Sequence, residues 1–176
     1  FTEKKFFRGY NNCNPSDTCT YIEVNYIEAA DGKLKDKVNS FLMRQILSGV
    51  SFGDTTYSSI QAAADSFIVL YSDFRKQEPA YTQYWYFEYF IRVTNETPSL
   101  VCIEASNNSY MGGAHPNSYA EFFNISKETG DTVSLRDVFN KGFEAPLNKL
   151  IDARYREIKG LKPGDNLQEK GDLFEN

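Results

Sequence analysis

The chain has 176 residues, of which 41% are hydrophobic and 24% charged, as expected for one soluble globular domain with its own core. Its net charge of −5 disfavours nucleic-acid binding, which needs a concentrated Lys and Arg surface. No run approaches the ~18 apolar residues of a membrane-spanning helix. Aromatic residues reach 15%, a share that favours strands and half-buried sheet faces.

The first half of the chain predicts strand and then helix. Residues 1–12 suit a leading strand or arm, and residues 20–28 alternate as a half-buried strand does. Apolar residues at helical spacing predict a helix over 34–49. A second helix is predicted over 55–76, with Asp54 as its N-cap.

The second half predicts a hairpin, a further strand and a last helix. Residues 84–93 and 99–106 read as antiparallel strands, and residues 118–126 as another. A capping box at Ser134-x-x-Asp137 starts a short helical turn, and a longer helix follows over 143–159. The expected fold is therefore α+β, with antiparallel sheet packed against about three amphipathic helices.

The strand over 84–93 supplies two candidate binding residues, Tyr84 and Tyr86. They share one face of the strand, whereas Trp85, Phe87 and Tyr89 share the other. Tyrosine rings could stack against the apolar faces of sugars. The alternative is that one face is core and a helix covers the other.

Cys13 and Cys19 flank a short polar segment and predict a local disulfide, with free thiols as the alternative. With one His in the chain, the pair is a poor zinc site, and we expect neither metal nor cofactor. A disulfide favours an oxidising, extracytoplasmic setting. Because the sequence begins at Phe1 rather than Met, we expect any export signal or lipid anchor to lie upstream.

The string from Gly112 to Asn117 is the most unusual motif, and His115 and Asn117 within it are candidate binding residues. One reading is a rigid connection between strands, with His115 hydrogen-bonded to backbone. The other is an enzyme that acts on cell-wall glycan, with His115 as general base beside carboxylates. Strand carboxylates that could serve as its acid and base are Glu88, Glu104 and Glu121.

The same segment carries a family resemblance. The run "GGAHPN", then Thr129-Gly130, then "SLRDVF" from Ser134 to Phe139 resembles the RsiV-like domain. That module forms the extracellular part of lysozyme-responsive anti-sigma factors and also occurs in PdaC-type peptidoglycan deacetylases and exported lipoproteins. The resemblance implies an α+β fold and a lysozyme-type protein or cell-wall glycan as partner. It also implies that deacetylation belongs to a separate domain, which this chain lacks.

Three functions remain open at this point. The leading hypothesis is a non-catalytic binding module on an exported protein, and the alternatives are the glycan-active enzyme and a purely structural spacer. We expect one domain over 1–176, with subregions at about 1–80 and 81–176. We also expect further strands beyond Leu173 and Phe174.

Overall fold

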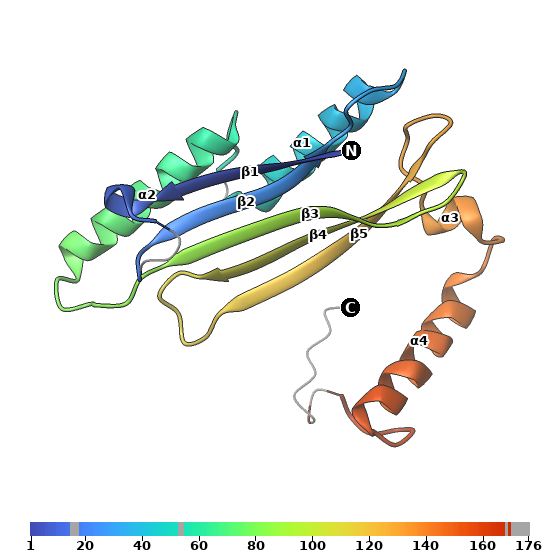
Figure 1. Ribbon diagram of the computed structural model, residues 1–176. Coiled ribbons are helices and arrows are strands. Elements are labelled where there is room, and N and C mark those ends of the chain that lie inside the picture. Colours follow the sequence, from blue (N-terminus) through green and yellow to red (C-terminus); the bar gives the residue numbers. More distant parts are fainter. Residues whose placement is uncertain (15–17, 53–54, 168, 170–176) are drawn as a thin grey trace. The chain divides into compact units, whose positions relative to one another are not determined.

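The computed structural model describes residues 1–14, 18–52, 55–167 and 169. The chain divides into two compact units, Phe1–Val133 and Ser134–Asn176. Among the described residues, the first unit contains a sheet with two α-helices and a short 3-10 helix (Tyr10–Asn12), and the second contains two further α-helices (Figure 1). Whether the whole chain is one domain stays a prediction, and the strands expected beyond Leu173 lie outside the described residues.

The first unit is built on a five-stranded sheet in the order β1-β2-β3-β4-β5 (Figure 1). Its strands are β1 (Thr2–Gly9), β2 (Tyr21–Glu28), β3 (Tyr86–Glu96), β4 (Leu100–Tyr110) and β5 (Asn117–Ser126). All neighbours pair antiparallel except β2 and β3, which run parallel. The parallel pair follows from its connection, because a crossover through helices returns the chain to the same end of the sheet. The α+β prediction is confirmed, with this one parallel pair as an addition.

Helices α1 (Lys35–Gly49) and α2 (Ile60–Gln77) provide that crossover and pack on one face of the sheet. Their apolar stripes meet the inward residues of the strands. Trp85, Phe87 and Tyr89, which the alternation places on one face, are buried there. The Tyr89 hydroxyl donates a hydrogen bond of 3.2 Å to the Gln45 carbonyl oxygen. A Cβ at Gly49 would lie 2.1 Å from the Tyr89 ring, so only glycine allows α1 to approach the sheet this closely.

The start predicted for the second helix was wrong. The helix begins at Ile60, because Ser59 is its N-cap and the Ser59 hydroxyl accepts a hydrogen bond of 3.1 Å from the Ala62 N–H. The apolar stripe that packs on the sheet starts only there. Asp54, the predicted cap, lies outside the described residues.

Strand β4 runs four residues further than predicted, and its last inward residues are polar. Asn107 and Ser109 are buried, where hydrophobic alternation offers no signal. The Asn107 amide donates a 3.3 Å hydrogen bond to the Glu88 carbonyl oxygen, and the Ser109 hydroxyl donates one of 3.2 Å to Asn107. These bonds satisfy the buried polar groups and allow the strand to continue.

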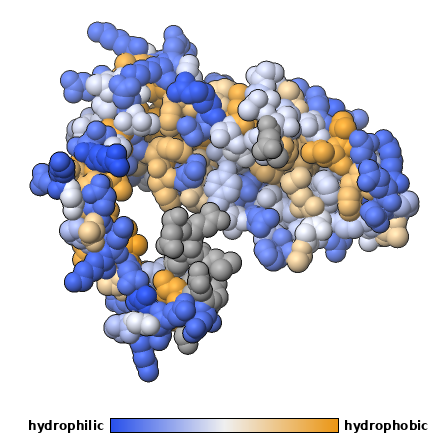
Figure 2. Space-filling model, turned by 180° about the vertical axis from the view of Figure 1, so that it is seen from behind, coloured by the Kyte–Doolittle hydropathy of each residue, from blue (hydrophilic) through white to orange (hydrophobic). Residues whose placement is uncertain are grey.

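The second unit contains α3 (Leu135–Val138) and α4 (Glu144–Lys159). The predicted capping box is present, and the Ser134 N–H donates a 2.7 Å hydrogen bond to the Asp137 carboxylate. The apolar stripe of α4 is exposed within the described residues at Leu150, Ile151 and Ile158. Figure 2 shows hydrophobic side chains at the surface of both units. Among the described residues, no helix has the length and apolar composition needed to cross a membrane.

Candidate functional site

The sheet face turned away from α1 and α2, called here the open face, carries a row of aromatic rings across four strands. Phe7 of β1, Tyr21 of β2, Tyr86 of β3 and Tyr110 of β4 follow one another with ring centroids 5.7, 6.3 and 6.3 Å apart. The strand register produces the row, because Tyr86 pairs with Tyr21 on one side and with Tyr110 on the other. All four rings are half-buried, so the row offers a partly exposed aromatic surface.

Glu88 lies beside this aromatic row on the central strand. Its carboxylate accepts a 2.6 Å hydrogen bond from the Tyr21 hydroxyl and a 3.1 Å bond from the Asn108 amide. Burial and the bond to Glu88 raise the pKa of Tyr21 above its ordinary value, so this phenol stays protonated and keeps donating.

The charge of Glu88 has no counter-ion among the residues that the structure describes. Its register partner on β2 is another carboxylate, Glu23, which is itself paired with the Lys5 ammonium at 2.8 Å. No Lys or Arg of the described residues forms an ion pair with Glu88. The open face therefore holds a half-buried carboxylate stabilised only by neutral donors.

The three carboxylates suggested by the sequence do not form an acid–base pair. Glu104 is bound by Arg92 at 3.0 Å, and Arg92 is four residues from Glu88 along β3, or about 13 Å at strand spacing. A glycosidase pair needs carboxyl groups within about 10 Å. Glu121 pairs with Ala105, a buried residue of the helix-covered face, so it lies on the opposite side of the sheet.

The structure brings the predicted residues Tyr84 and Tyr86 together. Both line a pocket of about 360 Å³ at one end of the aromatic row, together with Thr82, Gln83 and Tyr110. The Tyr110 hydroxyl donates a hydrogen bond to the Gln83 side chain, which fixes the amide in the pocket wall. This pocket combines aromatic rings with an amide that can both donate and accept hydrogen bonds.

The other two predicted residues, His115 and Asn117, lie apart from the Tyr84 pocket. His115 is exposed in the β4–β5 connection, and its Nδ1 lies 2.9 Å from the Pro116 carbonyl oxygen. No carboxylate among the described residues bonds to this ring, so the arrangement of a general base is not formed. Asn117 begins β5 and pairs with Ser109. Binding roles for both residues stay predictions.

The structure explains why the motif has a glycine at position 112. Gly112 has φ +85°, and a Cβ there would lie 2.9 Å from the Trp85 indole nitrogen and 3.1 Å from the Tyr81 hydroxyl. Gly113 has neither constraint, since the nearest atom to its Cβ would be 3.9 Å away. The motif thus holds the β4–β5 connection against the Trp85 side chain.

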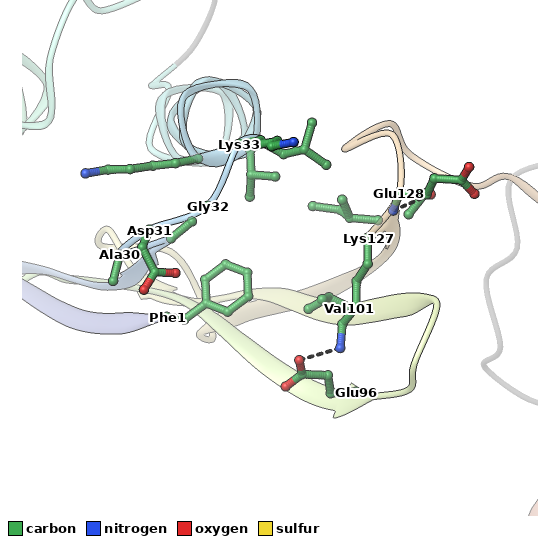
Figure 3. Close-up of a pocket in the computed structure, with 15 residues that line it drawn as sticks. Phe1, Ala30, Asp31, Gly32, Lys33, Glu96, Val101, Lys127 and Glu128 are labelled. Atoms are coloured by element: carbon green, nitrogen blue, oxygen red, sulfur yellow. Dashed lines mark hydrogen bonds and ion pairs between the residues drawn. The ribbon is translucent and has the colours of Figure 1, made fainter.

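A second pocket, of about 540 Å³, lies at the other end of the sheet (Figure 3). Val101 and Ile125 form part of its apolar lining, and the Phe1 ring points into it. The Lys127 ammonium and the Glu96 carboxylate form an ion pair of 2.6 Å on its rim. The remaining rim charges are of both signs, so the pocket shows no preference for an anion or a cation.

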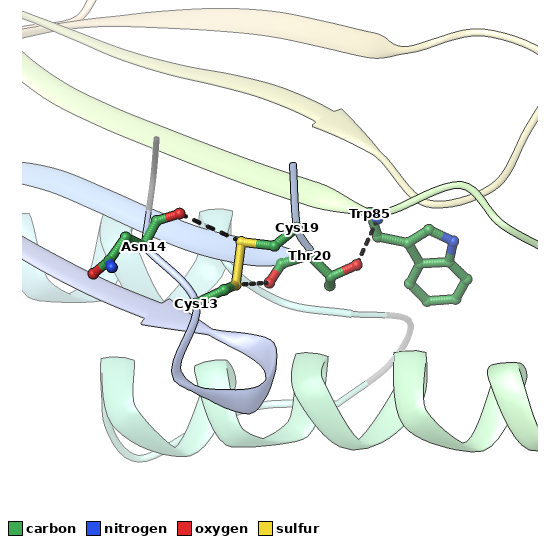
Figure 4. The surroundings of a disulfide bond; sticks show 5 residues. All are labelled: Cys13, Asn14, Cys19, Thr20 and Trp85. Carbon is green, nitrogen blue, oxygen red and sulfur yellow. Dashed lines mark hydrogen bonds between the residues drawn. A yellow bond between two sulfur atoms is a disulfide. The ribbon is translucent and has the colours of Figure 1, made fainter. Parts of the chain in front are cut away.

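The predicted disulfide between Cys13 and Cys19 is present, with Cα atoms 6.4 Å apart (Figure 4). It closes the connection from β1 to β2 next to Thr20, which is buried. The Thr20 hydroxyl accepts a 2.9 Å hydrogen bond from the backbone N–H of Trp85 (Figure 4). The disulfide therefore stabilises the end of the sheet where β2 and β3 begin.

Sequence reasoning missed Phe7, Tyr21, Tyr110 and Asn108 as members of the site. Alternation predicts that Tyr21 and Glu23 share one face of their strand, and that Tyr86 and Glu88 share one face of theirs. It does not say which strands are neighbours in the sheet. The row is visible only once the register of β1 to β4 is known.

Comparison with known proteins places the chain in a family. A family model described as "Deacetylase PdaC" matches residues 14–118. The fold is similar to a DUF3298 family protein from Pseudomonas aeruginosa PAO1, at 17% identity and TM-score 0.68 over 89% of this chain and 64% of that one. It is also similar to a DUF3298 family member from Bacteroides fragilis, at 16% identity and TM-score 0.66 over 96% of this chain and 73% of that one.

The chain thus spans less than two thirds of the Pseudomonas protein. The search of curated proteins finds no match. Because the PdaC family model covers more than half of its residues, the chain belongs to the PdaC family.

Proposed function

We propose that this chain is a non-catalytic extracytoplasmic binding domain whose open face binds a cationic protein of the lysozyme type. PdaC family domains are in general extracytoplasmic and related to the cell wall. The observation that carries the proposal is Glu88, a half-buried carboxylate that lies beside the aromatic row and forms no ion pair within the described part of the chain.

The chemistry of the open face favours a cationic partner over a neutral one. A ligand that covered Glu88 without supplying a positive charge would remove water from an unpaired carboxylate, which is costly. An Arg or Lys side chain would instead pair with Glu88 and lie against Tyr21 or Tyr86, where cation–π attraction adds to the ion pair. The net charge of −5 also speeds the encounter with a cationic protein.

Tyrosine is suited to such a surface. Its ring offers a large contact area at low cost in side-chain entropy, and its hydroxyl forms hydrogen bonds at the rim of the contact. The resemblance of the "GGAHPN" segment to the RsiV-like domain points to the same class of partner. The RsiV-like assignment within the PdaC family is part of this proposal.

The family description names a deacetylase, but this chain offers little support for that reaction. Its single His is bonded to backbone, and the described residues contain no group of three or more His, Cys, Asp or Glu side chains that could hold a metal ion. A binding role therefore fits these residues better than deacetylation.

A second candidate ligand is cell-wall glycan at the Tyr84 pocket. A volume of about 360 Å³ lies within the range of small-molecule sites and suits a single sugar ring. The rings of Tyr84, Tyr86 and Tyr110 would contact its apolar face, and Gln83 would bond to a hydroxyl or an acetamido group.

The two ligands are separated by calorimetric titration with a purified c-type lysozyme and by co-sedimentation with insoluble peptidoglycan. Glu88→Gln removes the charge and keeps the shape of the side chain, with one acceptor oxygen left for the Tyr21 hydroxyl or the Asn108 amide. We expect it to weaken lysozyme binding about tenfold or more. Glu121→Gln is the matched control, because it removes the same charge from the opposite face of the sheet. Its affinity should stay within about twofold of the wild type.

The glycan candidate predicts instead that Tyr84→Ala lowers retention on peptidoglycan while Glu88→Gln does not. Equal losses in Glu88→Gln and Glu121→Gln would show that lysozyme is attracted only by net charge. An absence of binding in both assays would remove both ligands.

A further inference from the structure

Glu88 lies between aromatic residues on the open face of the sheet. Strand alternation places Tyr86, Glu88 and Phe90 on that face of β3, and all three are half-buried. Each of the two aromatic residues is two positions from Glu88, or about 7 Å along the strand. Tyr21 of the neighbouring strand adds a third ring, which stacks with Tyr86 at a centroid distance of 6.3 Å. A side chain that reaches the Glu88 carboxylate therefore enters an aromatic surrounding.

The hydrogen bonds of Glu88 leave both of its carboxylate oxygens able to accept a further bond. One oxygen accepts from the Tyr21 hydroxyl at 2.6 Å, and the other accepts from the Asn108 amide at 3.1 Å. Because a carboxylate offers about four acceptor positions, each oxygen keeps one position for a donor from outside. The two existing bonds also hold the carboxylate in one orientation. The site therefore suits a donor group that can bond to both oxygens at once.

Arginine meets these conditions better than lysine does. A guanidinium donates two parallel N–H bonds to a carboxylate, whereas an ammonium acts as a point charge. The guanidinium is also planar, so it stacks on aromatic faces. Since it is more weakly hydrated than an ammonium, it loses less when it enters a half-buried site. The acceptor pair, the aromatic rings and the burial of Glu88 thus all favour a guanidinium.

The charges around Glu88 call for a single cation. Glu23, the register partner of Glu88 on β2, is paired with the Lys5 ammonium at 2.8 Å. Glu104 of β4 is bound by the Arg92 guanidinium at 3.0 Å. Both of these carboxylates already have their cation, so one further positive charge balances this part of the open face.

We propose that Glu88 is the anchor for one arginine side chain of the protein partner and that it selects arginine over lysine. This inference rests on the proposed function, because it takes the open face as the contact surface. In the complex, the guanidinium pairs with both oxygens of Glu88 and stacks on Tyr86 or Phe90. Tyr21 and Asn108 are positioning residues, since they act through the Glu88 carboxylate.

The selection is tested by calorimetric titration with a panel of c-type lysozyme variants, in each of which one surface arginine is replaced by lysine. Every variant keeps the charge of the lysozyme, so the overall electrostatic attraction is unchanged. We expect one variant to bind the wild-type chain about fivefold or more weakly than unmodified lysozyme does. That variant and unmodified lysozyme should bind Glu88→Gln with equal affinity, because the charged partner of the arginine is gone. Glu121→Gln is the control, and it should show the same difference as the wild type.

The outcomes separate this inference from the proposed function. If lysozyme binding depends on Glu88 but no variant loses affinity for the wild-type chain, the selection of arginine is wrong and the contact surface stands. A variant that loses equal affinity for the wild-type chain and for Glu88→Gln would place its arginine elsewhere, which also overturns the anchor.

If lysozyme does not bind at all, the capped peptides Gly-Arg-Gly and Gly-Lys-Gly at millimolar concentrations decide the question. Amide chemical-shift changes at Glu88 and Asn108 with the arginine peptide, and much smaller ones with the lysine peptide, would keep the arginine anchor and remove only the lysozyme partner. Equal changes with the two peptides, or none with either, would overturn the anchor.

Discussion

Replacing Gly112 with alanine tests whether the "GGAHPN" motif is architectural. The backbone at Gly112 has φ +85°, a region that side chains other than glycine rarely adopt. The new Cβ would also lie 2.9 Å from the Trp85 indole nitrogen, and Trp85 is only 7% exposed, so the ring has little room to move. Both effects act against the folded state.

The expected loss follows from these two effects. A residue with a Cβ in a left-handed conformation costs about 1–2 kcal/mol. Overpacking against a buried ring adds about 1–3 kcal/mol, part of which is relieved if the loop shifts. We therefore expect Gly112→Ala to lower the free energy of unfolding by about 2–4 kcal/mol, and to lower Tm by roughly 5–15 °C in a unit of this size.

Gly113→Ala is the matched control, because its Cβ would have no atom closer than 3.9 Å and its φ is not in the positive range. Urea unfolding followed by tryptophan fluorescence should place this control within about 0.5 kcal/mol of the wild type. If Gly112→Ala is equally neutral, or if Gly113→Ala is as damaging, the connection does not pack on Trp85 as described.

Three further changes test other parts of the fold. Replacing both Cys13 and Cys19 with serine should lower the unfolding free energy by about 2 kcal/mol in urea titrations, and an unchanged midpoint would show that the disulfide is dispensable. Ser59→Ala should cost about 1 kcal/mol, which Ser59→Thr should largely restore; equal losses in both would argue against capping. The hydrogen bond from the Lys37 ammonium lowers the pKa of Asp131, so its stabilisation is present above the ordinary carboxyl value and is lost as pH falls through the lowered one. Asp131→Asn should therefore lower Tm slightly at pH 7, with a difference that shrinks as the pH falls below about 4, and a constant difference would exclude the ion pair.

Strand faces were predictable from the sequence because they follow from alternation alone. The alternation of residues 84–93 placed Phe87 and Tyr89 on one face and Tyr86 and Glu88 on the other, as the structure has them, although it did not say which face is the core. The capping box at Ser134 was also predictable, since its residues are neighbours in sequence. These features depend on local chemistry, which a single sequence contains.

The composition of the site was not predictable, because it depends on which strands are neighbours. Tyr21 and Tyr86 are far apart in sequence and meet only because α1 and α2 return the chain parallel to β2. Likewise, the polar end of β4 at Asn107 and Ser109 gives no hydrophobic signal, although both side chains are buried. Long-range register and buried polar pairs therefore need the structure.

We propose the open face, and not the helix-covered side, as the binding surface. Amide chemical shifts of the ¹⁵N-labelled chain, recorded during titration with a c-type lysozyme, test it most directly. We predict that the largest changes fall on Tyr21, Tyr86, Glu88 and Asn108, and that Glu88→Gln strongly reduces them at the same subsaturating concentrations. Changes confined to α1 and α2, or undiminished changes in Glu88→Gln, would contradict it.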